Sequence, residues 1–287
     1  MVEITEAKKD VLGGVPIKRA LPLRQRRTVG PWCFADHMGP ADVDEKRAMN
    51  VGPHPHIGLQ TVTWLLDGQM LHRDSLGSEQ VLRPGQLNLM TAGGGVSHSE
   101  ESTGQYRGTL EGIQLWVAQP EATRHGDNDF EHIGDPAQGM VGEAEATIIV
   151  GEFAGLTSNA RRDTDHMGVD LSLRTSTTVP LRPDYEYSLI VMRGSASVDG
   201  QGVVPGQMAY IEPGRDELLI TVNEPSRVIL IGGVPFESPI VMWWNYVGRS
   251  KEEISEAHRS WQQIDGRFGD VDSLLPRYEF PSPPWER

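Results

Sequence analysis

A strand-and-turn unit occurs twice along this chain at matching spacing. Leu65-Leu66-Asp67-Gly68 in the first half resembles Val191-Met192-Arg193-Gly194 in the second half. Pro84-Gly85-Gln86-Leu87 likewise resembles Pro205-Gly206-Gln207-Met208, and in both copies another glycine follows the Pro-Gly glycine by eight residues. The repeat predicts two copies of one antiparallel β-domain, and a double-sheet jelly roll or barrel is the natural way to close such sheets.

Short apolar runs separated by glycine and proline fill most of the chain. Glycine (32) and proline (20) are abundant among the 287 residues, which suits many turns and argues against a mostly helical protein. The runs have the length of typical strands. They are Thr61–Leu66, Ile113–Val117, Ala146–Val150, Ser188–Met192, Leu218–Val222 and Arg227–Ile231. We therefore expect an all-β protein.

One helix is expected near the end of the chain. Ser250 and Glu253 have the spacing of a capping box, in which each side chain satisfies a backbone N–H of the first turn. Ile254, Ala257 and Trp261 then share one helical face, and Asp265-Gly266 is expected to end the helix.

The segment from about residue 120 to 142 is polar and rich in Gly, Asp and Glu, which is typical of a connection. We place the domain boundary within it. Residues 1–130 are predicted to form an N-terminal metal-binding domain, and residues 131–287 a C-terminal domain without metal ligands.

Charge and cysteine content restrict the partners and the compartment. The formal net charge of −14 opposes contact with phosphate backbones, so no direct nucleic-acid binding is expected. The single cysteine, Cys33, excludes an internal disulfide and a cysteine-rich zinc site. No signal peptide is expected in the first ten residues, and no apolar run approaches the length of a membrane span. These features predict a soluble cytoplasmic protein without membrane contact.

Two pairs of polar residues have the spacing of metal ligands. His54 and His56 are two residues apart in an extended, proline-flanked segment, so both side chains point to one face. His98 and Glu100 have the same spacing after a glycine-rich turn. If the two strands are neighbours, three imidazoles and one carboxylate converge, a set that suits a first-row divalent metal.

The second repeat provides an internal control for these residues. An ungapped alignment on the turn glycines places Pro180 and Arg182 opposite the first histidine pair. It places Leu219 and Thr221 opposite His98 and Glu100. The fold therefore does not demand the histidines, and we expect one metal per chain, bound by the first repeat.

Other side chains are weaker candidates. Gln114 and Trp116 alternate on one strand, where facing the metal pocket and plain strand packing are both open readings. His37 and His72 are candidates for the pocket mouth, with a solvated loop as the alternative. Cys33 is expected to be a buried apolar residue rather than a reactive thiol. Four histidines in polar segments are expected at the surface, namely His125, His132, His166 and His258.

The histidine strand, glycine hairpin, Pro-Gly turn and later histidine resemble the two motifs of a cupin. The longer string Pro53–Glu101, together with Leu110–Val117 and Pro239–Asn245, is similar to the pirin family. This resemblance implies two tandem cupin (double-stranded β-helix, or jelly-roll) barrels with one metal, usually iron, in the N-terminal barrel. It carries over as metal ligands His54, His56, His98 and Glu100. The common cupin glutamate position holds Gln60 here, so the carboxylate has to come from Glu100.

The resemblance also implies an activity. Pirin-like proteins include flavonol (quercetin) 2,3-dioxygenases, so the expected ligands are a small aromatic, flavonol-like substrate and O2, with Glu100 as catalytic base as well as metal ligand. Fe(II) is the expected cofactor, and Mn, Ni, Co, Cu or Zn would also suit the donors. The alternative is a non-enzymatic, redox- or metal-responsive regulatory protein that binds a protein partner. A sugar isomerase of the cupin type, or a structural metal, is a third reading.

Overall fold

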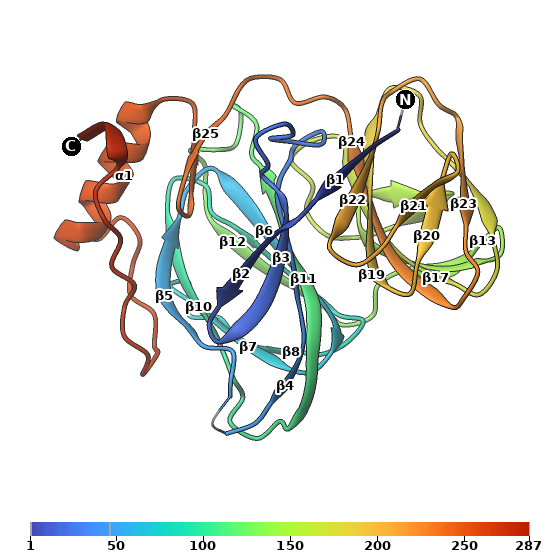
Figure 1. Ribbon diagram of the computed structural model, residues 1–287. Helices are drawn as coiled ribbons and strands as arrows, with labels where there is room; N and C mark the ends of the chain where they lie inside the picture. Colours follow the sequence, from blue (N-terminus) through green and yellow to red (C-terminus); the bar gives the residue numbers. More distant parts are fainter. Residues whose placement is uncertain (1, 46, 287) are drawn as a thin grey trace.

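The computed structural model describes residues 2–45 and 47–286. Two β-barrels lie side by side, and the C-terminal helix packs on the side of the first barrel that faces away from the second (Figure 1). Each barrel consists of one seven-stranded and one four-stranded antiparallel sheet. The predicted all-β fold with two cupin barrels and a short C-terminal helix is confirmed.

The first barrel is built from two sheets whose strands alternate in the chain. In sheet order, its larger sheet contains β12 (Asp129–Ile133), β9 (Leu87–Thr91), β6 (Leu59–Asp67), β11 (Gly108–Ala118), β4 (Trp32–Val43), β3 (Val15–Leu21) and β2 (Lys8–Leu12). Its smaller sheet contains β5 (Val51–His56), β10 (Val96–Glu101), β7 (Met70–Asp74) and β8 (Glu79–Leu82).

The second barrel repeats this arrangement. In sheet order, its larger sheet contains β1 (Val2–Glu6), β22 (Gln207–Ile211), β19 (Glu186–Arg193), β24 (Ser226–Gly233), β17 (His166–Leu173), β14 (Ala144–Val150) and β13 (Gln138–Val141). Its smaller sheet contains β18 (Thr177–Pro180), β23 (Glu217–Thr221), β20 (Ala196–Val198) and β21 (Gln201–Val203). Two short hairpins lie outside these sheets, β15 (Glu152–Phe153) with β16 (Leu156–Thr157) and β25 (Val241–Trp243) with β26 (Tyr246–Gly248).

The repeated turns have the same backbone conformation in both barrels. Gly68 and Gly194 have φ of 100° and 72°, and Gly85 and Gly206 have φ of 74° and 98°. These left-handed values favour glycine, which explains why the turn glycines stand out in both copies. All six predicted apolar runs lie on strands, although Val222 falls one residue past the end of β23.

One edge strand of each large sheet comes from an unexpected part of the chain. β12 follows the first barrel in sequence and pairs with β9, whereas β1 begins the chain and pairs with β22 of the second barrel. Both occupy the same position in their sheets. The domain boundary between residues 130 and 131 remains a prediction. A cut there would divide β12 and would separate β1 from the sheet of the second barrel.

The outer faces of the two large sheets pack against each other. The apolar layer between them includes Trp64, Leu115 and Ile113 from the first barrel and Ile190 and Ile229 from the second. Polar contacts cross the same contact surface, because the Trp64 indole N–H donates to Asp170 and the Arg193 guanidinium pairs with Glu111. The inner face of the first large sheet is therefore free to line the barrel interior.

The helix α1 (Lys251–Gln263) begins at Ser250, whose hydroxyl accepts from the Glu253 N–H at 3.2 Å. The Glu253 carboxylate accepts from the N–H of Arg249 rather than from that of Ser250, so the capping box is shifted by one residue. The helix ends at Ile264, which itself adopts the left-handed conformation. A 3-10 turn (Pro284–Glu286) follows. Among the described residues, no helix has the length and apolar character needed to cross a membrane.

Candidate metal centre

Three histidine side chains meet inside the first barrel. β5 and β10 are antiparallel neighbours in which His98 lies opposite His54 and Val96 opposite His56. The Nε2 atoms of His56 and His98 are 3.0 Å apart, and one ring nitrogen from each of the three histidines lies within 4.8 Å of the others. All three side chains are buried. The predicted convergence of these three residues is therefore present in the structure.

The hydrogen bonds of the rings assign their tautomers. The Nδ1–H of His54 donates to the carbonyl of Gly52 at 2.9 Å, and the Nδ1–H of His56 donates to the carbonyl of Asn245 at 2.9 Å. Since a carbonyl only accepts, the proton of each neutral ring is on Nδ1. The Nε2 lone pairs of both rings are then left unprotonated.

A second layer of side chains assigns the tautomer of His98. Its Nδ1 lies 3.4 Å from Nδ1 of His72, whose Nε2 lies 2.9 Å from the Asp74 carboxylate. Burial would raise the pKa of Asp74, but its hydrogen bonds with the His72 ring and the Ser78 N–H lower it. The ionised carboxylate accepts from His72 Nε2–H, so His72 Nδ1 is the acceptor for His98 Nδ1–H. The His98 Nε2 lone pair is then free as well.

The donor set fits a divalent metal ion. Burial lowers the pKa of His54 to about 4, and burial together with the neighbouring histidines places the pKa of His98 well below its ordinary value. Neutral imidazoles with lone pairs only 3.0 Å apart repel each other, and a cation between them removes this repulsion. Two nitrogens bound at right angles with bonds of about 2.1 Å are about 3.0 Å apart, which matches the His56–His98 spacing.

Glu100 lines the same pocket but lies outside the histidine group. Burial raises the pKa of its carboxyl to about 7, against a hydrogen bond from Thr63 that lowers it. The strand pairing has an irregularity between His98 and Glu100, which shifts the register of the carboxylate relative to β5. Its role as the fourth ligand remains a prediction.

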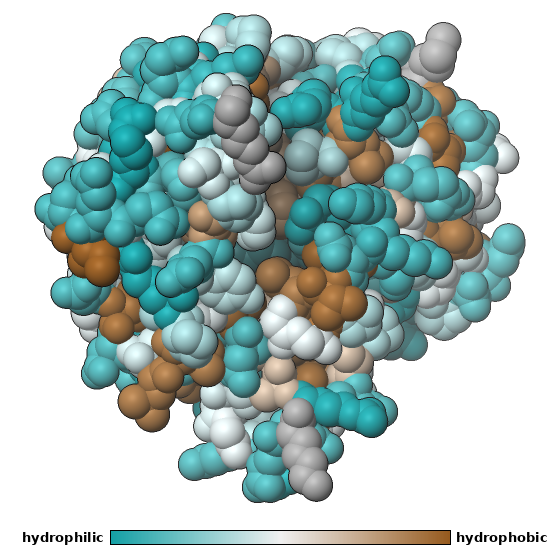
Figure 2. All heavy atoms as spheres, turned by 60° about the vertical axis from the view of Figure 1, so that its left-hand side comes forward, coloured by the Kyte–Doolittle hydropathy of each residue, from teal (hydrophilic) through white to brown (hydrophobic). Residues whose placement is uncertain are grey.

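A cavity of about 760 Å³ opens in front of His54, His56 and Glu100. This is the size of a site for a small organic molecule. Figure 2 brings the side of the molecule with the C-terminal helix forward and shows a hollow with apolar side chains among hydrophilic ones. The aromatic residues that line the cavity are Phe34, Trp116, Trp243, Trp244, Tyr278 and Phe280, and its charged residues are Lys8, Asp10, Arg19, Arg27 and Glu100.

The inner face of the large sheet presents two parallel rows of side chains. One row is aromatic and apolar apart from one threonine, and it contains Phe34, Trp116, Thr61, Met90 and Phe130 on neighbouring strands. The other row, called the polar row below, crosses the whole sheet and contains Lys8, Arg19, Asp36, Gln114, Thr63, Asn88 and His132.

Gln114 and Trp116 line the cavity, one in each row, so of the two open readings the one in which they face the pocket is confirmed. The Trp116 ring stacks on Phe34 with centroids 4.0 Å apart and meets His56 edge-on at 5.1 Å. Neither Gln114 Oε1 nor Trp116 Nε1 has a hydrogen-bond partner among the described residues. Such buried groups cost about 1–3 kcal/mol each unless a ligand or water satisfies them.

Four of the weaker histidine predictions are wrong. His37 lies on the opposite face of the sheet from the cavity, where it is buried 3.1 Å from Glu111. His166 and His258 are buried rather than at the surface, because His166 packs edge-on to Trp32 between the barrels and His258 packs against Trp243. His72 is also away from the mouth, since it lies behind His98.

Other predictions agree with the structure in full or in part. His125 is exposed as expected, whereas His132 is half-buried and contacts Asn88. Cys33 is fully buried, and burial raises the pKa of its thiol to about 12, which makes it inert. Gln60 is buried and donates to Thr91, so it offers nothing to the histidine group.

Sequence reasoning missed most of the cavity wall. Lys8 and Arg19 come from the first two strands of the large sheet, and Tyr278 comes from the segment after the helix. The Tyr278 N–H donates to the Pro53 carbonyl at 2.8 Å, which brings the end of the chain onto the histidine strand. Only the tertiary structure shows this contact, because no local motif marks it.

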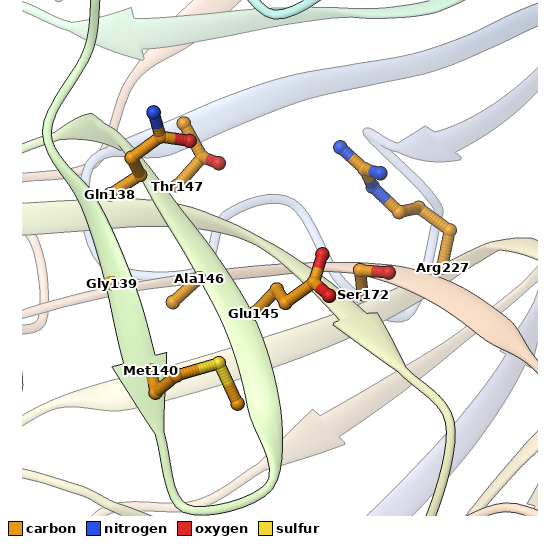
Figure 3. Close-up of a pocket in the computed structure, with 8 residues that line it drawn as sticks. All are labelled: Gln138, Gly139, Met140, Glu145, Ala146, Thr147, Ser172 and Arg227. Atoms are coloured by element: carbon orange, nitrogen blue, oxygen red, sulfur yellow. The ribbon is translucent and has the colours of Figure 1, made fainter.

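The second barrel has no equivalent centre at the corresponding position. Leu219, which the ungapped alignment places opposite His98, is 56% exposed, and the inward positions of the pair are instead Thr177, Val179, Leu218 and Ile220. The true correspondence is thus shifted by one residue, but the inward side chains still offer no metal ligand. A shallow pocket of about 280 Å³ lies on this barrel between β13, β14, β17 and β24 (Figure 3). Its one cation, Arg227, is paired with Asp170.

Comparisons with known proteins agree with this architecture. A family model described as Pirin matches residues 14–117, and one described as Pirin C-terminal cupin domain matches residues 167–269. A Pseudomonas aeruginosa protein named "Putative quercetin 2,3-dioxygenase" is 42% identical over 99% of this chain and 90% of its own length. A pirin-like protein of Caulobacter vibrioides is 36% identical over 94% of this chain and 96% of its own length.

Two solved structures extend the comparison. A quercetin 2,3-dioxygenase from Acinetobacter baumannii superimposes with a TM-score of 0.95 at 42% identity, covering 99% of this chain and 96% of that one. A bacterial pirin from Escherichia coli in complex with nickel(II) superimposes with a TM-score of 0.65 at 16% identity, covering 82% of this chain and all of the other. The second likeness is one of fold.

Proposed function

The chain belongs to the pirin family, and from that premise we propose that it is a metal-dependent flavonol (quercetin) 2,3-dioxygenase. His54, His56, His98 and Glu100 hold one divalent metal, with Fe(II) as the first candidate. The observation that carries the proposal is the set of unprotonated imidazole nitrogens at the end of a 760 Å³ cavity with aromatic walls. The names of similar proteins supply the substrate class.

A divalent ion held by these residues would act as a Lewis acid and would lower the pKa of a substrate hydroxyl bound beside it. The protein supplies the proton acceptor. Glu100 is a buried carboxyl that lines the cavity beside His54 and His56, and it is placed to take the hydroxyl proton. The Thr63 hydroxyl holds the carboxyl in place by a hydrogen bond.

The cavity walls orient the aromatic rings of the substrate and exclude water. Phe34 and Trp116 form one stacked wall beside His56. Tyr278, Phe280 and the β25–β26 hairpin, which come from the C-terminal part of the chain, form the opposite side. Exclusion of water favours reaction of the substrate anion with O2 over side reactions.

The test is aerobic turnover of a flavonol after reconstitution. Metal-free protein is loaded anaerobically with Fe(II), Mn, Co, Ni, Cu or Zn in turn, and oxygen uptake and loss of flavonol absorbance are then followed. We expect turnover with at least one of these metals at one ion per chain. Absence of turnover with all six would overturn the proposal and favour the regulatory, partner-binding alternative.

A further inference from the structure

We propose, as an extension that rests on the proposed function, that the substrate carries an anionic oxygen group at the end remote from the metal. This group, a carboxylate or an acidic phenolate on a planar aromatic molecule, is received by Lys8, Arg19 and Arg27. The chain has a net charge of −14, yet these three cations line the cavity that reaches His54 and His56. The cavity is thus selective for charge as well as for shape.

Arg19 is the fixed member of this cationic end. Its Nε and Nη2 donate to the two carboxylate oxygens of Asp36 at 2.8 and 2.7 Å, which locks the guanidinium plane. The guanidinium also lies 4.7 Å from the centroid of the Phe34 ring. The remaining nitrogen, Nη1, stays outside the Asp36 pair. An arginine held in this way presents its free N–H groups to a ligand with little further loss of entropy.

Lys8 and Arg27 supply the uncompensated charge. Lys8 lies opposite Arg19 on the neighbouring strand, so both belong to the polar row. The side chains of Lys8 and Arg27 form no ion pair or hydrogen bond with another described residue, and both line the cavity. Asp10 is the only carboxylate at this end of the lining, and it accepts from the N–H of Val11. Two free cations against one carboxylate leave this end positive.

The polar row also sets the length of the ligand. Thr63, which bonds to Glu100, lies three strands from Arg19 in the polar row. Since neighbouring strands are about 4.8 Å apart, about 14 Å separates these two residues. A molecule of two or three rings spans this distance. Gln114 lies between them, and its unpartnered Oε1 is available to a hydroxyl on the middle of the ligand.

The test compares two probes that differ only at the remote end, 3-hydroxyflavone and its 4′-carboxylate. Binding to the nickel-loaded protein is measured without oxygen by quenching of tryptophan fluorescence at low salt. We expect the carboxylate to bind on the order of tenfold more tightly, as for one charge-assisted hydrogen-bonded contact. The double variant Lys8→Gln/Arg27→Gln should lose this preference and bind 3-hydroxyflavone as before.

The matched control is Lys9→Gln/Arg24→Gln, which removes the same charge from neighbouring exposed residues that do not line the cavity. It should keep the preference. Equal affinity of the unmodified protein for both probes, binding of neither, or the same loss in the control would overturn the inference. Turnover in air is scored separately. A carboxylate preference without turnover overturns only the dioxygenase proposal, whereas turnover without a preference overturns only this one.

Discussion

The two barrels share strand order, turn geometry and sheet sizes, but they differ in what fills them. The second barrel is packed by a continuous apolar cluster that includes Leu171, Leu189, Leu218 and Ile220. In the first barrel, histidines, a glutamate and the polar row occupy the corresponding space. Its apolar residues form separate, smaller clusters. The same fold therefore encloses an apolar core in one copy and a cavity lined by polar and aromatic residues in the other.

The difference shows that the fold does not depend on the polar interior. Backbone pairing and the apolar layer between the large sheets are common to both barrels. Buried polar groups in the first barrel are tolerated because most have partners, such as the Arg19–Asp36 and His72–Asp74 pairs. Two of the buried groups that lack partners, Gln114 Oε1 and Trp116 Nε1, belong to residues that line the cavity, where a ligand would satisfy them.

The largest expected effect is on metal content. His56→Ala should reduce bound metal from one ion per chain to near zero, because it removes one imidazole from a set of three that share the ion. The fold should persist, as the second barrel persists without any such residue. The measurement is elemental analysis after reconstitution, with exposed His125→Ala as the control that keeps its metal. Full occupancy in His56→Ala, or two ions per chain in the unmodified protein, would contradict this comparison of the barrels.

Glu100→Gln should affect turnover more than metal binding. The amide keeps the size and an oxygen donor but loses the charge and the basicity, so we expect flavonol turnover to fall about 10²–10⁴-fold. A bound cation acidifies the chelated hydroxyl of the substrate, and this makes transfer of its proton to Glu100 feasible.

The rates are compared at equal metal occupancy, with Glu101→Gln as the control. Glu101 is next in the chain but points away from the cavity, towards Ser99 and Arg73. Normal turnover in Glu100→Gln would leave the site catalytic but remove Glu100 as its base.

Residue spacing was sufficient to predict the repeat, the strands and the histidine group. The i, i+2 spacing of His54 and His56 fixed their common face, and β5–β10 pairing then supplied His98. The ungapped alignment places Leu219 opposite His98, but the inward residue is its neighbour. Loops of different length shift such an alignment, and a shift of one residue moves a side chain to the other face of a strand. The burial of His166 was not predictable, since Trp32, which covers it, is distant in sequence. The burial of His258 could have been predicted, because it lies four residues after Ile254 and three before Trp261, on the helical face expected to be buried.

The apolar filling of the second barrel predicts a large stability cost there without any effect on the metal. Leu189 is fully buried in this core, so Leu189→Ala should reduce the free energy of unfolding by about 2–5 kcal/mol. Leu219→Ala is the matched control, because its side chain is exposed on the same barrel and should change stability by less than about 0.5 kcal/mol. Denaturant unfolding measures both. Equal losses of unfolding free energy in the two variants would contradict this prediction. Loss of metal from Leu189→Ala at low temperature would show that the second barrel also affects the metal site.

The smallest effect concerns His72 and Asp74, which form a layer behind the three histidines proposed to bind the metal. His72→Ala removes the acceptor of His98 Nδ1–H and the donor to Asp74, so the His98 ring loses the partner that fixes its tautomer and orientation. Losses of such supporting partners typically weaken metal binding about 10–100-fold, or about 1.4–2.7 kcal/mol. Competition with a chelator for Ni(II) gives the affinity. His132→Ala is the control, since His132 bonds to Asn88 on the same sheet and has no contact with the three histidines. An unchanged affinity in His72→Ala would mean that the strand pairing of β5 and β10 alone orients the ligands, and a loss as complete as that of His56→Ala would instead make His72 a ligand itself.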